Sequence, residues 1–399
     1  MVRGYDLKEF TQGQKQTYWS AVETYRDYLE ALEESRVFKG SMHWKKIRGR
    51  DYLYRYRDRF GRGESLGPRS EDTEQLFSQF TRERREAAAR LREERSRLAE
   101  QAGFCRAAKI NRTPRTLARI LGLLASRESG GDPLVIGTAA LFAYEAAAGV
   151  FLNPAVGLHI PGPSGLAGFK RQGPVGEHPA AGQPSAPPVR PQPPVPPTSK
   201  NSITAAEASP ERTPAASLTA NQTLTLLSPG EASWSDLLHL LRRADRSFAP
   251  DPQGECRALN REGFLVRMLK TGARRPGKQK AVTVPGAREP LPPEAGNLSF
   301  LAAAAKFSQV VVGKDGFPAT MVVADPRAFV LNKFWLSEQE DREPAKRARD
   351  LSQALAVAGL VLGYLPEYDF FSTELEMLPQ DLVQSAAGLA EDADAAGED

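Results

Sequence analysis

The segment that decides the fold runs from residue 134 to residue 150 and reads Leu134-Val135-Ile136-Gly137-Thr138-Ala139-Ala140-Leu141-Phe142-Ala143-Tyr144-Glu145-Ala146-Ala147-Ala148-Gly149-Val150. A short aliphatic run, a break at Gly137-Thr138 and an alanine-rich stretch ending at Gly149 predict a buried strand, a tight turn and a helix. Backbone N–H groups at such a turn can hold a phosphate. The alternative is that Gly137 serves only close packing between strand and helix.

Bulk composition sets the outer limits for the 399-residue chain. A hydrophobic content of 41% with 31 prolines indicates a folded core accompanied by segments that do not fold. Two cysteines fit a reducing compartment, and the four histidines lack the spacing of a zinc site. No apolar run has the length of a membrane span and the first ten residues lack a signal-peptide core, so we expect no membrane association and a cytoplasmic location.

The first third of the chain is basic, although the net charge is only +4. Residues 12–36 predict an amphipathic helix whose apolar face carries Trp19, Val22, Tyr25, Leu29 and Leu32. Residues 42–60 predict a hairpin, because three tyrosines alternate with three arginines in the second strand.

That hairpin is a candidate contact for nucleic acid through Lys45, Arg55, Arg57 and Arg59, with tyrosines available for stacking. The alternative, which we favour on sequence grounds, is that the tyrosines pack on neighbouring helices while the arginines are only solvated. A long, highly charged helix is then predicted from a cap at Ser70 to about Ala107.

After residue 152 the composition changes to Pro, Ala, Gly, Ser and Thr, without apolar periodicity up to about residue 230. Such a segment is predicted to be a disordered insert, serving as a spacer or as a proline-rich ligand. Beyond it, strands are predicted at 255–260 and 263–270, a hairpin around Lys314-Asp315-Gly316, and helices beginning at Asp325-Pro326 and at Pro344. We therefore divide the chain into an extension (1–110), two core parts (111–152 and 231–385), the insert (153–230) and an acidic tail (386–399).

Several blocks resemble a bacterial family of nucleotidyltransferase-like proteins that carry an N-terminal extension. These blocks are Gly40-Ser41-Met42-His43-Trp44-Lys45, Ser65-Leu66-Gly67-Pro68-Arg69-Ser70, residues 137–150, Leu241-Arg242-Arg243-Ala244-Asp245-Arg246-Ser247-Phe248, and Asp325-Pro326-Arg327-Ala328-Phe329 with Lys333. The resemblance implies an α/β (α+β) fold with a small mixed sheet flanked by helices.

The same resemblance implies transfer of a nucleotidyl group from a nucleoside triphosphate to an acceptor that the sequence does not identify. Gly137, Thr138 and Lys333 would contact phosphate, and Lys346 with Asp350 would orient the base. Mg²⁺ would be the cofactor, held by carboxylates on the strand after Gly149 and on a later strand.

Those carboxylates are not found where the resemblance expects them. The sequence has no aspartate between Asp132 and Asp236, and Arg267 stands where a further family carboxylate is expected. Either the chain has lost the metal site, or residues 153–227 represent a wrong-frame translation of GC-rich DNA. We therefore predict no metal ligand. The alternative function is a non-catalytic module that binds nucleic acid or a protein.

Overall fold

The computed structural model describes residues 7–57, 61, 63–127, 133–153, 223–228, 233–270 and 298–370. All of them belong to one compact unit formed by residues 1–160 and 218–399. The acidic tail and most of the predicted insert lie outside the described residues.

The main sheet has seven strands in the order β11-β12-β5-β7-β10-β9-β8. It is mixed, because β10 pairs with β7 and β12 with β5 in parallel, whereas the other neighbours are antiparallel. This confirms the predicted α+β class. The strands are β5 (Leu134–Ile136), β7 (Thr223–Ser228), β8 (Ala249–Pro250), β9 (Arg257–Leu259), β10 (Leu265–Lys270), β11 (Lys306–Val312) and β12 (Pro318–Ala324).

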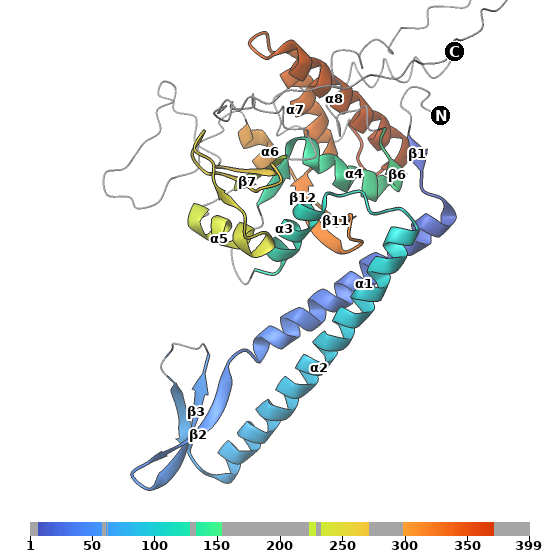
Figure 1. The fold of residues 1–399 in the computed structure, drawn as a ribbon. Helices are drawn as coiled ribbons and strands as arrows, with labels where there is room; N and C mark the ends of the chain where they lie inside the picture. Colours follow the sequence, from blue (N-terminus) through green and yellow to red (C-terminus); the bar gives the residue numbers. More distant parts are fainter. Residues whose placement is uncertain are drawn as a thin grey trace, which may run out of the picture. The chain divides into compact units, whose positions relative to one another are not determined.

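Helices cover both faces of this sheet (Figure 1). Successive strand residues point to opposite faces, so Val135 packs in a core with α3 and α5, while Leu134 and Ile136 pack with α6. A 3₁₀ turn, η1 (Gly137–Ala140), leads from β5 into α4 (Leu141–Ala148), one of the covering helices. The helices are α3 (Arg115–Ala125), α4 (Leu141–Ala148), α5 (Trp234–Ala244), α6 (Ser299–Ala303), α7 (Pro326–Glu338) and α8 (Pro344–Tyr364).

The strand β7 corrects the predicted insert. Residues 153–230 were expected to lack regular structure, yet Thr223–Ser228 form a strand that lies between β5 and β10. Four consecutive leucine and threonine side chains there, from Leu224 to Leu227, are buried because both faces of the central strand are covered. A run this short inside a Ser/Thr/Pro-rich segment does not show a period.

The N-terminal part consists of two long helices, α1 (Gln12–Val37) and α2 (Glu71–Ala107), which lie side by side in Figure 1. Both begin with a capping box, at Thr11 and at Ser70, as the sequence predicts for the second helix. A two-stranded ribbon of β1 (Lys8–Glu9) and β6 (Val150–Phe151) joins the start of the chain to the end of α4.

The predicted apolar face of α1 is wrong at Trp19, which is 61% exposed. Tyr25 of the predicted face is buried, and Tyr18 and Ala21, which the prediction left out, are buried as well. The hydroxyl of Tyr18 donates to the Val310 carbonyl at 2.8 Å, and that of Tyr25 accepts from the Thr320 amide at 3.3 Å. Contact with β11 and β12 therefore buries Tyr18 in addition to Tyr25 and leaves Trp19 exposed.

The predicted hairpin is present and gains a third strand. β2 (Ser41–Ile47), β3 (Arg50–Tyr56) and β4 (Glu64–Pro68) form an antiparallel sheet. Met42 and Leu53 pack with Phe80 of α2 on one face. The favoured interpretation, with tyrosines packed on helices, is wrong: Leu53 occupies the helix-facing side, and Tyr52, Tyr54 and Tyr56 alternate to the other side.

Candidate functional site on the central strands of the main sheet

The turn after β5 has the geometry that the sequence predicts. Gly137 has φ +76°, which strongly favours glycine, and a Cβ placed there would meet nothing within 4 Å. Glycine is thus required by the backbone conformation and not by close packing. Gly149 ends α4 in a left-handed conformation with φ +63°.

Thr138 is linked to the last helix. Its Oγ1 accepts a hydrogen bond of 3.0 Å from Nε2 of Gln353, a side chain that is fully buried in α8. Among the described residues, the Gln353 Oε1 atom is buried without a hydrogen-bond partner, as is Nδ2 of Asn332 in α7. Unpaired buried polar atoms are costly, so the Oε1 atom of Gln353, whose side chain contacts Thr138, fits a polar ligand or ordered water.

A buried carboxylate connects α7 and α8 one turn before Gln353. Asp350 is 0% exposed, and its two oxygens accept from Lys333 Nζ at 2.7 Å and Arg342 Nε at 2.6 Å. Burial lowers the pKa of Lys333; Asp350 opposes this shift, whereas Arg349 and Arg342 add to it. The cluster therefore holds three cations and one carboxylate.

The structure brings together some of the predicted site residues and separates others. Lys333 and Asp350 are in direct contact, and Asp350 shares its helix with the partner of Thr138. Lys346 instead lies at the exposed surface, where it pairs with Glu343 at 2.8 Å.

Thr225 of β7 is a site residue that sequence reasoning missed. Its Oγ1 accepts a 3.2 Å hydrogen bond from Arg267 Nη2 of β10, and the same two residues are paired in the sheet. Ile136, the residue before Gly137, pairs with Thr225 on the other side. The alternation Thr223-Leu224-Thr225-Leu226 was the available signal, although it is too short to stand out in that composition.

The part of the main sheet around Arg267 is positively charged. Arg267 pairs in register with Arg257 of β9, and burial together with Arg257 lowers the pKa of the Arg267 guanidinium. Arg257 donates to Asp251 at 2.7 Å, while its buried Nε has no hydrogen-bond partner within the described part of the chain. Arginine remains charged at neutral pH despite such shifts.

These residues do not fit a magnesium site. Magnesium prefers carboxylate oxygens, whereas Thr225 is occupied by a guanidinium that repels a divalent cation. Across the described ranges, no group of three or more His, Cys, Asp or Glu side chains could hold a metal ion. We therefore assign no magnesium ligand to these residues.

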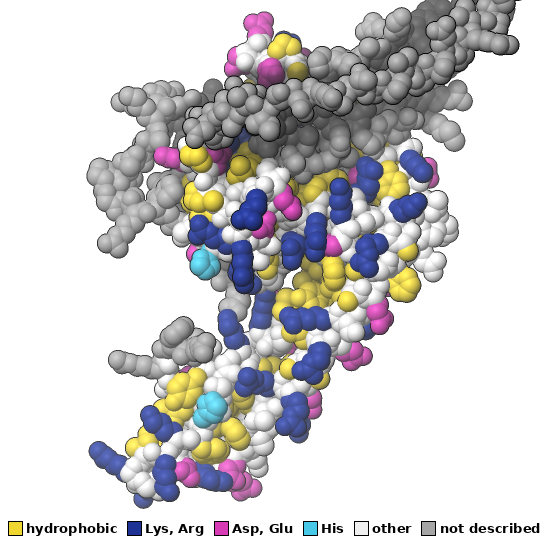
Figure 2. Space-filling model, in the orientation of Figure 1, with side chains coloured by type: hydrophobic (Ala, Val, Ile, Leu, Met, Phe, Trp, Pro, Cys, Tyr) yellow, Lys and Arg dark blue, Asp and Glu magenta, His cyan; other side chains and the backbone are white. Residues whose placement is uncertain are grey.

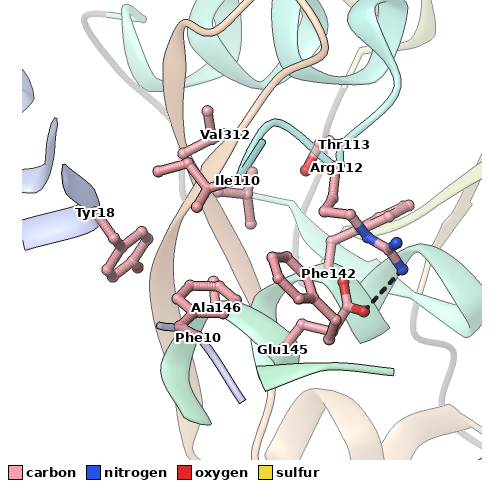
Figure 3. Close-up of a pocket in the computed structure, with 11 residues that line it drawn as sticks. Phe10, Tyr18, Ile110, Arg112, Thr113, Phe142, Glu145, Ala146 and Val312 are labelled. Carbon is pink, nitrogen blue, oxygen red and sulfur yellow. Dashed lines mark hydrogen bonds and ion pairs between the residues drawn. The ribbon is translucent and has the colours of Figure 1, made fainter. Parts of the chain in front are cut away.

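Glu145 of α4 lines a separate small cavity (Figure 3). Its Oε1 accepts from the Leu152 amide at 2.6 Å and from Arg112 Nη2 at 3.1 Å. Burial raises the pKa of Glu145 to about 7, against the opposing effects of Arg112 and the Leu152 amide. The cavity measures about 20 Å³ and has room for about one water, so it is not a nucleotide pocket.

The predicted nucleic-acid contacts divide between the two faces of the small sheet. Lys45 lies over the Tyr54 ring at 5.6 Å, whereas Arg55 lies over Phe80 of α2 at 5.4 Å. Arg57 is exposed and approaches Glu64 at 3.7 Å. Arg59 lies outside the described residues.

Comparison with known protein families gives a match to one segment of the chain. Residues 216–377 match the model of a family described as Nucleotidyltransferase. The matched segment contains β7, β10, α7 and α8, hence Thr225, Arg267, Lys333 and Asp350. The match indicates nucleotidyl transfer at a general level. β5 and the Gly137 turn precede the matched segment in the chain.

No curated protein and no solved structure matches the chain. None of the helices within the described part of the chain is long and apolar enough to span a membrane.

Proposed function

We propose that this protein binds a nucleoside triphosphate through its phosphates, on a nucleotidyltransferase-type scaffold, at a site formed on the central strands of the main sheet by Gly137, Thr138, Thr225 and Arg267. The observation that carries the proposal is the hydrogen bond from Arg267 to Thr225, beside the strand that ends in the Gly137 turn. A guanidinium next to a glycine turn that leads into a helix is a suitable receptor for phosphate oxygens.

In this proposal, positively charged side chains neutralise the phosphate charge that a metal ion neutralises in other phosphate-binding sites. Arg267 neutralises phosphate charge directly, and the Thr225 hydroxyl fixes the direction of its guanidinium. Thr138 has its Oγ1 held by Gln353, which leaves the hydroxyl proton available to a phosphate oxygen. Lys333 acts indirectly, because its ammonium is committed to Asp350 between α7 and α8.

This arrangement favours nucleotide binding over completed transfer. Attack on the α-phosphorus needs positive charge at both the attacking and the leaving oxygen. The described residues supply charge for bound phosphate but no carboxylate set to place two metal ions. The segment match supports nucleotidyl transfer as the reaction class of the scaffold, and the acceptor stays open.

The test is calorimetric titration of the full chain with ATP, GTP, CTP and UTP, with and without Mg²⁺. We expect binding that does not depend on Mg²⁺ and that falls about tenfold in Arg267→Gln, since a charge-assisted hydrogen bond is lost. Arg243→Gln, at an exposed position on α5, is the control and should bind as the parent does.

Two results would overturn the proposal. One is the absence of binding for every nucleotide under both conditions. The other is binding that requires Mg²⁺ and is unchanged in Arg267→Gln, which would place the phosphates on a metal site away from this arginine.

A further inference from the structure

The small sheet presents an aromatic face that no helix covers among the described residues. His43, Lys45, Tyr52, Tyr54 and Tyr56 point to this side, because His43 pairs with Tyr54, Lys45 pairs with Tyr52, and alternate residues of a strand share a face. We call it the outer sheet face. The opposite face is closed by Leu53, Met42 and Phe80 of α2.

The rings of the outer sheet face stand in a row. The centroids of Tyr54 and Tyr56 are 6.4 Å apart, and those of His43 and Tyr56 are 6.2 Å apart. The tyrosine pair matches the repeat of about 6.6 Å between alternate residues of a strand. All three tyrosines are half-buried, so each ring keeps part of its surface accessible.

Positive charge accompanies these rings. Residues 41–57 contain six lysines and arginines and a single acidic residue, Asp51. Lys45 lies over the Tyr54 ring at 5.6 Å, and Arg50, which pairs with Ile47 at the turn, is exposed. In Figure 2, basic and hydrophobic side chains lie next to one another over the region of β2 and β3.

Aromatic rings in a row, bordered by cations, match the chemistry of single-stranded nucleic acid. Such proteins stack successive bases on aromatic side chains and hold the backbone with Lys and Arg. A duplex keeps its bases stacked inside and offers only phosphates to a flat aromatic surface. A protein partner would not require this excess of positive charge.

We propose that the outer sheet face binds single-stranded nucleic acid, with bases stacked on Tyr54 and Tyr56 and phosphates held by Lys45 and Arg50. This inference is independent of the nucleotide site at Arg267, because it concerns a different sheet and different residues. It also changes the predicted contact set, since Arg55 faces α2 and is excluded.

The test is fluorescence anisotropy of the full chain with labelled poly-U and poly-dT of about 12 nucleotides, and with a duplex of equal length. We expect the single strands to bind more tightly than the duplex. Tyr54→Ala and Tyr56→Ala should each weaken single-strand binding about tenfold, whereas Tyr54→Phe, which keeps the ring, should bind as the parent does. Lys45→Gln should reduce the salt dependence of binding by about one phosphate contact.

Phe104→Ala on α2 is the matched control, because it removes a 62% exposed aromatic ring away from this sheet. Circular dichroism melting identifies any variant that fails to fold, and Tyr54→Phe with Lys45→Gln then carries the test. Equal affinity for duplex and single strand, unchanged binding in folded alanine variants, or no binding by the parent would each overturn the proposal.

Discussion

At the scale of single residues, Glu145 is a carboxyl group whose buried environment opposes its charge. It is 3% exposed, and burial raises its pKa from 4.5 to about 7 although Arg112 lies at 3.1 Å. The increase in pKa caused by burial of the carboxyl group is thus larger than the decrease caused by the partly exposed Arg112 guanidinium. The folded protein consequently retains a proton at Glu145 over a range in which the unfolded chain has lost it.

This difference predicts a loss of stability as pH rises. Between about pH 4.5 and pH 7 the folded state binds more protons at Glu145 than the unfolded state, so the free energy of unfolding falls by up to about 3 kcal/mol. Glu145→Gln keeps an oxygen for the Leu152 amide and should remove this slope. The measurement is urea unfolding of both proteins at pH 5, 6 and 7.

Glu93→Gln, at an exposed position on α2, is the control and should keep the slope of the parent. If Glu145→Gln shows the same fall in stability between these pH values as the parent, Glu145 is already ionised at pH 5 and the raised pKa is refuted.

At the scale of elements, the hairpin between β11 and β12 fits against the end of α2. Gly316 has φ +90°, and a Cβ there would come within 2.0 Å of the Ala102 carbonyl oxygen. Arg106 of α2 also donates to the Asp315 carbonyl of the same turn, at 2.6 Å. The turn therefore needs glycine for its conformation and for the close approach of the helix backbone.

Gly316→Ala should destabilise the protein by about 3 kcal/mol, from the strain of a positive φ and from displaced packing. Gly122→Ala provides the matched opposite case, because Gly122 lies within α3 and a Cβ there meets nothing within 4 Å. It should stabilise the protein by about 0.5–1 kcal/mol. Thermal unfolding of both variants checks the pair, and equal effects would contradict this account of the turn.

At the scale of the whole molecule, the main sheet is assembled from segments far apart in the chain. β5 lies between β12 and β7 and pairs with both, whereas the family match begins at residue 216, after β5. The matched segment alone thus exposes the strand edges of β12 and β7 and lacks part of each of the two cores.

A fragment of residues 216–377 should not form a fixed tertiary structure by itself. We expect near-ultraviolet circular dichroism without the aromatic signal of the full chain, and rapid amide exchange in β7 and β12. Co-expression with residues 1–160 as a separate chain should restore both. A fragment that unfolds cooperatively alone would show that β5 is dispensable.

The sequence predicted those elements whose boundaries have local causes. The Gly137 turn, the Ser70 cap, the helix starts at Asp325-Pro326 and Pro344, and the hairpin at Gly316 were all placed correctly. Backbone conformation, capping hydrogen bonds and proline geometry depend on residues a few positions apart, so their signals can be recognised in the sequence.

Tertiary structure alone decided which faces are buried and which polar groups meet. Trp19 and Tyr18 are adjacent in the chain, and Tyr18 is buried where it contacts β11 and Phe10. Thr225 contacts Arg267 and became a candidate site residue because β7 lies between β5 and β10. Asp350 contacts Lys333 because α8 packs on α7. These outcomes depend on the burial of apolar surface and the pairing of charges between distant segments, which no local pattern records.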